Sequence, residues 1–321
     1  MINNSTTNSL IKHQQQQVAP LFKPPWNILY VALTTIIITI GVTLNSMTAF
    51  LYWKRRIIHN NFNYALQYIS IIGIFQLIGF IPFMVLREPF HPASTYDARV
   101  SVLCSLTQGM TLFFGPAFAN VYIISFLSME RYLVIKHPLI SLKVNTKTTS
   151  HIILVFCTFA FLISLPNFPT FKTDQLGLCT RPYFKFSMVY ATLVTFLGLV
   201  IPTVIMVIAY VLTIHHLFKA SSTSIQENSN RMRHRKKIVR SLGVLIGVFL
   251  ICWTPFSINW IASYMGVYSS DEQGLINYKR INNMVIIPPL LVPTLNNIIY
   301  GMTKYDIRGM RNTITHKKNA I

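Results

Sequence analysis

The longest uncharged stretch of the sequence, residues 186–218, reads FSMVYATLVTFLGLVIPTVIMVIAYVLTIHHLF and contains no Asp, Glu, Lys or Arg. A helix needs about 20 apolar residues to cross the hydrocarbon core of a bilayer, and this stretch is longer than that. Six further uncharged runs of 23 to 30 residues lie at 24–53, 57–86, 100–129, 148–171, 241–270 and 281–303. Because lipid offers the backbone no hydrogen-bond partner, each run is expected to be helical. The sequence therefore predicts an all-α membrane protein, a seven-transmembrane helix bundle.

The composition agrees with a membrane protein. Hydrophobic residues make up 52% of the chain and charged residues 11%, against about 25% charged residues in ordinary soluble domains. The net charge of +20 would suggest nucleic-acid binding in a soluble protein. Here the uncharged runs comprise 200 of the 321 residues, so the basic residues are concentrated in the loops and tails between them. No nucleic-acid partner is expected.

The charges of the short loops predict the orientation. One side holds 19 Lys and Arg residues, in the segments 54–56, 130–147, 219–240 and 304–321. The other side holds 9, in the N-terminal tail and in 87–99, 172–185 and 271–280. The first side is expected in the cytoplasm and the N-terminus outside. Asn3 and Asn4 begin overlapping glycosylation sequons in the outer tail.

Three parts follow from this topology. Residues 1–25 are expected to form an extracellular tail without the pattern of a cleaved signal peptide. Residues 26–303 form the membrane domain, and residues 304–321 a short amphipathic helix 8 with the cytoplasmic tail. The basic cluster that ends the loop 219–240 is interpreted either as a stop-transfer signal or as a docking face for an acidic partner.

The four cysteines divide by position. Cys157 and Cys252 lie inside apolar runs and are expected to be small buried residues. Cys104, at the outer start of the third helix, and Cys179, in the outer loop 172–185, both face an oxidising compartment. A disulfide between them is expected to hold this loop across the outer mouth of the bundle.

Two short motifs suggest a function. Glu130-Arg131-Tyr132 ends the third helix, where an adjacent acid can hold the guanidinium close in a low dielectric. The alternative is an arginine that only reaches the membrane interface. In Cys252-Trp253-Thr254-Pro255, the proline removes a backbone donor and predicts a kink beside a bulky ring. Here the alternative is a tryptophan that only packs.

Together these features resemble the rhodopsin-like (class A) G-protein-coupled receptors. Seven helices with an outer N-terminus, Glu-Arg-Tyr after the third helix and Cys-Trp-Thr-Pro in the sixth are typical of that family. Further family positions are matched by Asn45, Pro202, Tyr210, Asn296 and Tyr300. The resemblance covers about residues 25–312, and the run 237–255 is most similar to neuropeptide receptors.

The resemblance implies a receptor that passes an extracellular signal to a heterotrimeric G protein. In the family mechanism an agonist favours one of two pre-existing states. The sixth helix swings outward, Arg131 leaves Glu130, and a cavity opens for the G protein. The residues implied in this switch are Glu130, Arg131, Tyr132, Pro202, Tyr210, Phe249, Trp253, Pro255, Asn296 and Tyr300.

The chain departs from the family pattern inside the bundle. The departures are Gly73 in place of Asp, Asn120 in place of a hydroxyl, Phe156 in place of Trp and Asn297 in place of Pro. A buried sodium ion needs oxygen ligands and a counter-charge. Without the acid at Gly73, no sodium site and no other metal site is expected. Arg235 stands where some members carry an acid that clasps Arg131, so raised basal activity is expected.

The ligand is expected to be a peptide or a small molecule that is not an amine. Phe113 occupies the position where amine receptors of the family carry an Asp. The run 281–303 contains no Lys, which excludes a retinal Schiff base, and no cofactor is expected. The expected pocket consists of Phe113, Phe114, Trp253, Phe256, Asn259, Trp260, Asn282 and Ile286. About half of these residues are expected to pack helix against helix instead.

Other functions remain open at this point. A chemosensory receptor of the same fold is one, and a receptor-like protein that no longer signals is another, motivated by Gly73 and Asn297. A transporter is the least favoured, because it would need polar or ionisable groups at mid-membrane. No set of nucleophile and base or of metal ligands in the sequence suggests an enzyme. The expected location is the plasma membrane, with the bilayer, a ligand and a G protein as partners.

Overall fold

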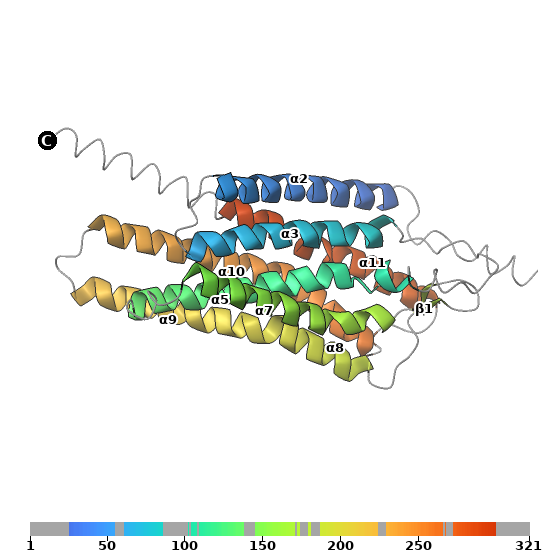
Figure 1. Ribbon diagram of the computed structural model, residues 1–321. Coiled ribbons are helices and arrows are strands. Elements are labelled where there is room, and N and C mark those ends of the chain that lie inside the picture. The colour runs from blue at the N-terminus through green and yellow to red at the C-terminus, as the bar shows by residue number, and fades with distance from the viewer. Residues whose placement is uncertain are drawn as a thin grey trace, which may run out of the picture.

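The computed structural model is a bundle of long helices that lie side by side (Figure 1). It describes residues 26–54, 61–85, 102, 104–107, 109–137, 145–170, 172–173, 179–180, 187–223, 229–265, 267 and 272–299. Its α-helices are α2 (Trp26–Lys54), α3 (Asn61–Val85), α5 (Thr111–Lys136), α7 (Thr146–Ser164), α8 (Ser187–Thr195), α9 (Ile201–Thr223), α10 (Ser229–Tyr264) and α11 (Glu272–Val285). The predicted all-α membrane bundle is confirmed. The predicted helix 8 lies outside the described residues.

Six helical spans are long and apolar enough to cross a membrane, judged by length and composition over the described part of the chain. They correspond to the first six uncharged runs. The seventh run is divided, because α11 ends at Val285, Ile286 forms a turn and residues 287–299 are helical again. Pro288 and Pro289 lie two and three residues after Ile286 and have no backbone N–H to donate.

The fifth membrane helix is built from three segments. A π-helix, η3 (Phe196–Val200), joins α8 to α9. Within it the backbone N–H of Ile201 bonds to the carbonyl of Phe196, five residues back. Pro202 follows and cannot donate the next bond of that series. A π-segment of this kind changes the direction and the register of the side chains that follow it.

The third membrane helix is interrupted near its start. Its span begins at Cys104, as predicted. Residues 104–107 form a separate helical turn, Met110 has a positive φ of 49°, and α5 itself begins at Thr111. Gly109 is required at the break, since a Cβ there would overlap the backbone oxygens of Ser105 and Asn167.

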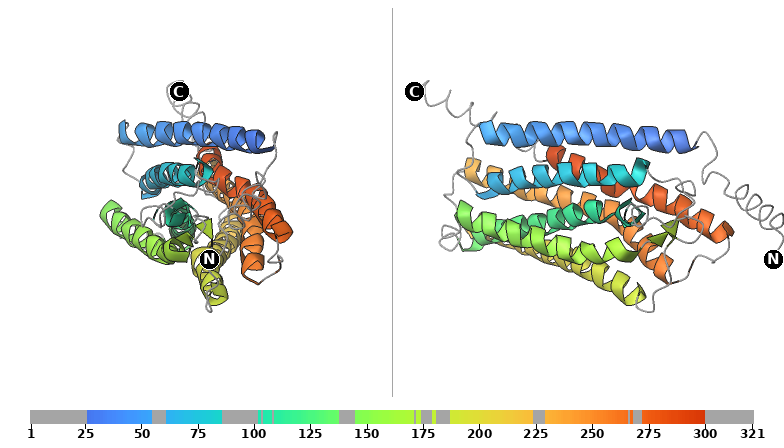
Figure 2. Two further views of the ribbon diagram at one scale, coloured as in Figure 1. Left: turned by 90° about the vertical axis from the view of Figure 1, so that its right-hand side faces the viewer. Right: turned by 45° about the vertical axis from the view of Figure 1, so that its right-hand side comes forward.

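The helix α5 lies in the middle of the bundle, surrounded by the other membrane helices (Figure 2). Most of its side chains are buried, and it packs against α3, α7 and α9. After α7 the chain forms the 3-10 helix η2 (Leu165–Thr170) and a short hairpin. The hairpin pairs β1 (Lys172–Thr173) with β2 (Cys179–Thr180) and lies at one end of the bundle (Figure 1).

The basic cluster before the sixth run is helical rather than a loop. The helix α10 begins at Ser229, twelve residues before the uncharged run that starts at 241. Arg and Lys are good helix formers, so the helix continues past the apolar segment. The side chains of residues 231–236 lie outside the described part of the structure.

Candidate functional site

A small cavity lies between α5, η2, the fifth membrane helix and α10. It is lined by Phe114, Phe118, Asn167, Val194, Thr195, Leu199, Phe256, Ser257 and Trp260. Aromatic rings from α5 and α10 form two of its walls. Its hydroxyl groups are already used locally, since Thr195 donates to the carbonyl of Ala191 and Ser257 to that of Trp253. None of these lining residues carries a charge, so the cavity suits an uncharged group.

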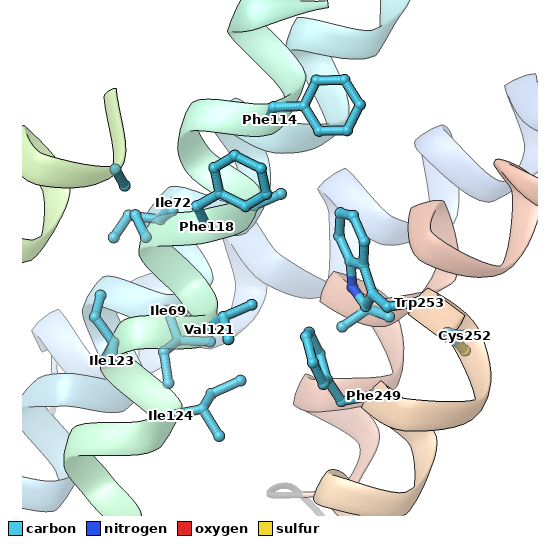
Figure 3. Packing of buried hydrophobic residues seen from close by; sticks show 14 of the residues in the cluster. Ile69, Ile72, Phe114, Phe118, Val121, Ile123, Ile124, Phe249, Cys252 and Trp253 are labelled. Atoms are coloured by element: carbon cyan, nitrogen blue, oxygen red, sulfur yellow. The ribbon is translucent and has the colours of Figure 1, made fainter. Parts of the chain in front are cut away.

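A column of aromatic rings connects the cavity with the middle of α10. The ring of Phe256, which lines the cavity, lies edge-on to Trp253 at a centroid distance of 6.0 Å. Trp253 in turn lies 6.0 Å from Phe249 and stacks on Phe113 at 6.3 Å. Figure 3 shows Phe249 and Trp253 projecting from α10 toward α5, where Phe118 belongs to the same cluster. A change at the cavity wall would therefore act directly on these rings.

Side chains of α5 satisfy the irregular backbone of the fifth membrane helix. The carbonyl of Leu197 would bond to residue 202 in a π-helix, but proline has no N–H. The Tyr122 hydroxyl donates to that carbonyl instead, and Ser125 donates to the carbonyl of Pro202. The ring of Tyr122 also stacks on Phe156 of α7 at 5.5 Å. These contacts fix the segment that presents Leu199 to the cavity.

The centre of the bundle holds an uncharged amide network. Asn297 donates to the side-chain oxygen of Asn45 and accepts from Ser70 at 2.9 Å. Asn45 donates to the carbonyl of Gly41 at 2.7 Å. A Cβ on Gly73 would lie 2.7 Å from the Asn45 oxygen, so the network occupies the space that a larger residue there would need. This network joins α2, α3 and the seventh membrane helix through hydrogen bonds alone.

A second amide contact lies beside the first. Asn120 of α5 donates to the side-chain oxygen of Gln76 of α3 at 3.1 Å. The other polar atoms of this pair, Nε2 of Gln76 and Oδ1 of Asn120, are buried without a hydrogen-bond partner in the described structure, as are both side-chain polar atoms of Asn296. Buried polar atoms of this kind are normally satisfied by ordered water.

At the C-terminal end of α5, the guanidinium of Arg131 is mostly buried and contacts Glu130 and Phe62. An oxygen of Glu130 lies 3.7 Å from one of its terminal nitrogens, beyond ordinary hydrogen-bond distance. The centre of the guanidinium lies 4.0 Å from the ring centroid of Phe62, the second residue of α3. Tyr132 points elsewhere and stacks on His216 of α9 at 5.7 Å.

Residues 44–300 match the family described as 7 transmembrane receptor (rhodopsin family). The chain belongs to this family. It is therefore a multi-pass membrane receptor, and the family implies an extracellular ligand and a G protein as partners.

The receptor brings the predicted pocket residues together only in part. Phe114, Phe256 and Trp260 line the cavity. Phe113 and Trp253 stack beneath it, and Ile286 is fully buried. Asn259 donates to Asn282 at 3.3 Å, which links α10 with α11. The cavity is thus displaced toward η2 and α8 relative to the prediction.

The predicted switch residues divide between the two halves of the receptor. Phe249, Trp253 and Pro255 lie along α10, and Pro202 begins the regular part of the fifth membrane helix. The Tyr210 hydroxyl packs directly on Gly243 of α10, where a Cβ would overlap it. Tyr300 and the side chains of Arg235 and Cys179 lie outside the described residues, as do Asn3 and Asn4. Cys157 and Cys252 carry free thiols, whereas Cys104 does not.

Sequence reasoning missed six residues of the cavity: Phe118, Asn167, Val194, Thr195, Leu199 and Ser257. Phe118 could have been found, because it lies one helical turn after Phe114 on the same face of α5. The residues of the fifth membrane helix could not, because η3 changes which side chains face inward. Asn167 enters through η2, a 3-10 segment that an uncharged run does not reveal.

Proposed function

We propose that this receptor couples an extracellular ligand without a cationic amine, either a peptide or a small molecule, to a heterotrimeric G protein at the plasma membrane. The observation that carries the proposal is the arrangement along α10. An uncharged cavity at one end of the aromatic column connects, through Phe256 and Trp253, with the middle of the helix.

The chemistry of the cavity supports the exclusion of amines. An ammonium group buried among Phe114, Phe256 and Trp260 would have no carboxylate to pair with among the residues that line the cavity. An uncompensated charge in such a place is costly. The space between the rings, about 10 Å³, holds about one water, so an aromatic or aliphatic group of a ligand would enter by parting the rings, with the amide of Asn167 as the polar contact.

The inner end of α5 supports the G-protein side of the proposal. Arg131 is buried against its own helix and α3, a position that it would leave when a partner enters. We expect Arg131→Ala to reach the cell surface and to lose agonist-dependent nucleotide exchange. A variant that couples normally would contradict the role given to Arg131. A protein that never exchanges nucleotide with any G protein would instead be a receptor fold that does not signal.

The ligand site has a matched test in neighbouring residues. Leu199 faces the cavity, whereas Val200 is exposed on the lipid side of the same π-segment. Leu199→Trp should fill the cavity and abolish the response in a ligand screen that uses a promiscuous G-protein reporter. Val200→Trp should respond like the unchanged receptor at equal surface expression. Equal responses of both variants would refute the assignment of the cavity as the ligand site.

The proposal also covers the N-terminal tail and the disulfide on the outer side of the membrane. The N-terminus lies outside and is glycosylated at Asn3 or Asn4, and Cys104 pairs with Cys179. Such a disulfide would tie the hairpin of β1 and β2 to the start of the third membrane helix, over the cavity. Similarity of the run 237–255 to neuropeptide receptors favours a peptide over a chemosensory ligand.

A further inference from the structure

An aromatic ring from a neighbouring helix contacts Arg131. The centre of the guanidinium lies 4.0 Å from the centroid of the Phe62 ring, well inside the distance of about 6 Å at which cation–π attraction acts. We propose that Phe62 is the positioning residue that holds Arg131 in the silent state of the receptor. The proposal rests on the proposed coupling to a G protein.

The ion pair beside this contact is loose. The distance of 3.7 Å between Glu130 and Arg131 exceeds hydrogen-bond range. The two residues are also neighbours on one helix, so their attraction cannot tie α5 to another element. The ring of Phe62 belongs to α3, and its contact with Arg131 therefore connects two helices.

The burial of Arg131 favours an aromatic ring as its partner. The Arg131 side chain is only 12% exposed, and cation–π attraction is strongest where both partners are desolvated. A guanidinium is planar and more weakly hydrated than an ammonium, so it stacks on a ring at little cost in hydration. Phe62 is half-buried and packs against the core, which fixes its position.

The sixth membrane helix offers no acid for the same task. The segment 229–264, which forms α10, contains no Asp or Glu. An acid of α10 therefore does not hold the silent state, whereas the contact of Phe62 with Arg131 does so through the α3–α5 pair.

The decisive variant is Phe62→Leu, which keeps an apolar side chain but removes the ring. We expect ligand-independent nucleotide exchange per surface receptor to rise about 2- to 30-fold, which is the range that corresponds to a cation–π attraction of about 0.5–2 kcal/mol. Phe62→Trp keeps a ring of stronger attraction and should show no more basal exchange than the unchanged receptor. Phe75→Leu, at an exposed position of the same helix, is the matched control and should change nothing.

A second measurement does not depend on any G protein. In purified receptor whose Cys157 and Cys252 have been replaced, a fluorescent label at the exposed position Arg240→Cys reports movement of the inner part of α10. Phe62→Leu should shift this signal in the direction that agonist does, and Phe62→Trp should not. A Phe62→Leu variant with unchanged signal and unchanged basal exchange would overturn the proposal.

Equal effects of Leu and Trp at position 62 would also overturn it, because they would show that the volume of the side chain matters rather than the ring. The proposed function is tested separately from the role of Phe62. If Arg131→Ala couples normally, the G-protein role is wrong, whereas the label at Arg240→Cys still reports whether the ring of Phe62 restrains α10.

Discussion

Replacing Tyr122 by Phe removes one hydroxyl from the middle of the bundle and leaves the ring in place. That hydroxyl is the donor to the carbonyl of Leu197, which Pro202 cannot satisfy. The ring keeps its stacking on Phe156 at 5.5 Å. The variant therefore isolates the cost of leaving one backbone carbonyl of η3 without a partner.

Two general ranges set the expected loss in the free energy of unfolding. Hydrogen bonds between side chains in membrane bundles contribute about 0.6 kcal/mol on average and up to about 1.7 kcal/mol. A buried polar group left unsatisfied costs about 1–3 kcal/mol. For Tyr122→Phe we expect a loss of about 1–2 kcal/mol in the free energy of unfolding. At about 2 °C per kcal/mol, the value for long chains, the melting temperature should fall by about 2–4 °C.

The assay can use the receptor's own cysteines. Cys252 is buried and Cys157 is half-buried, and both are free. A thiol-reactive dye that fluoresces on reaction reports their exposure as the receptor unfolds in lipid nanodiscs. Tyr64→Phe is the matched control, because in the described structure its hydroxyl pairs with that of Tyr68 at 3.2 Å and not with a backbone carbonyl. A melting temperature that is unchanged in Tyr122→Phe, or that falls equally in Tyr64→Phe, would refute the reasoning.

Three further changes test other parts of the receptor. Cys104→Ser and Cys179→Ser should each reduce surface expression or ligand binding. The double variant should be no worse than either, because bonded partners act as one unit. Additive losses would mean that the two cysteines are not bonded to each other. Sodium chloride should leave agonist affinity the same as an equal concentration of a bulky organic chloride, because Gly73 provides no counter-charge; a selective, saturable fall would reveal a sodium site. Gly243→Ala should displace the Tyr210 hydroxyl and lower agonist efficacy at equal surface expression. An unchanged response would mean that Tyr210 does not take part in activation.

The number and order of the membrane helices could be predicted because the absence of charge over 20 or more residues is a direct requirement of the bilayer. The interruptions inside those helices could not. The break at Met110 and the π-segment of η3 depend on contacts with other helices, such as the close approach of Gly109 to Asn167. Periodicity along a single run does not report such contacts.

The residues of the candidate site were likewise predictable where they lie on regular helix, and not where the helix is interrupted. Phe114 and Phe256 were found because family spacing along regular helix places them. Leu199 was missed because it follows an irregular turn. The contact of Arg131 with Phe62 was missed for a different reason. Phe62 lies at the start of α3, more than 60 residues away, and no motif joins the two positions.

The amide network around Asn45 and Asn297 has a consequence for the receptor in an electrically active membrane. Moving one elementary charge through 100 mV of membrane potential changes the free energy by about 2.3 kcal/mol. The hydrogen bonds among Asn45, Ser70 and Asn297 involve only neutral groups, so their rearrangement moves no net charge through the field and takes up no proton. This part of the bundle therefore does not contribute a dependence on voltage or on pH.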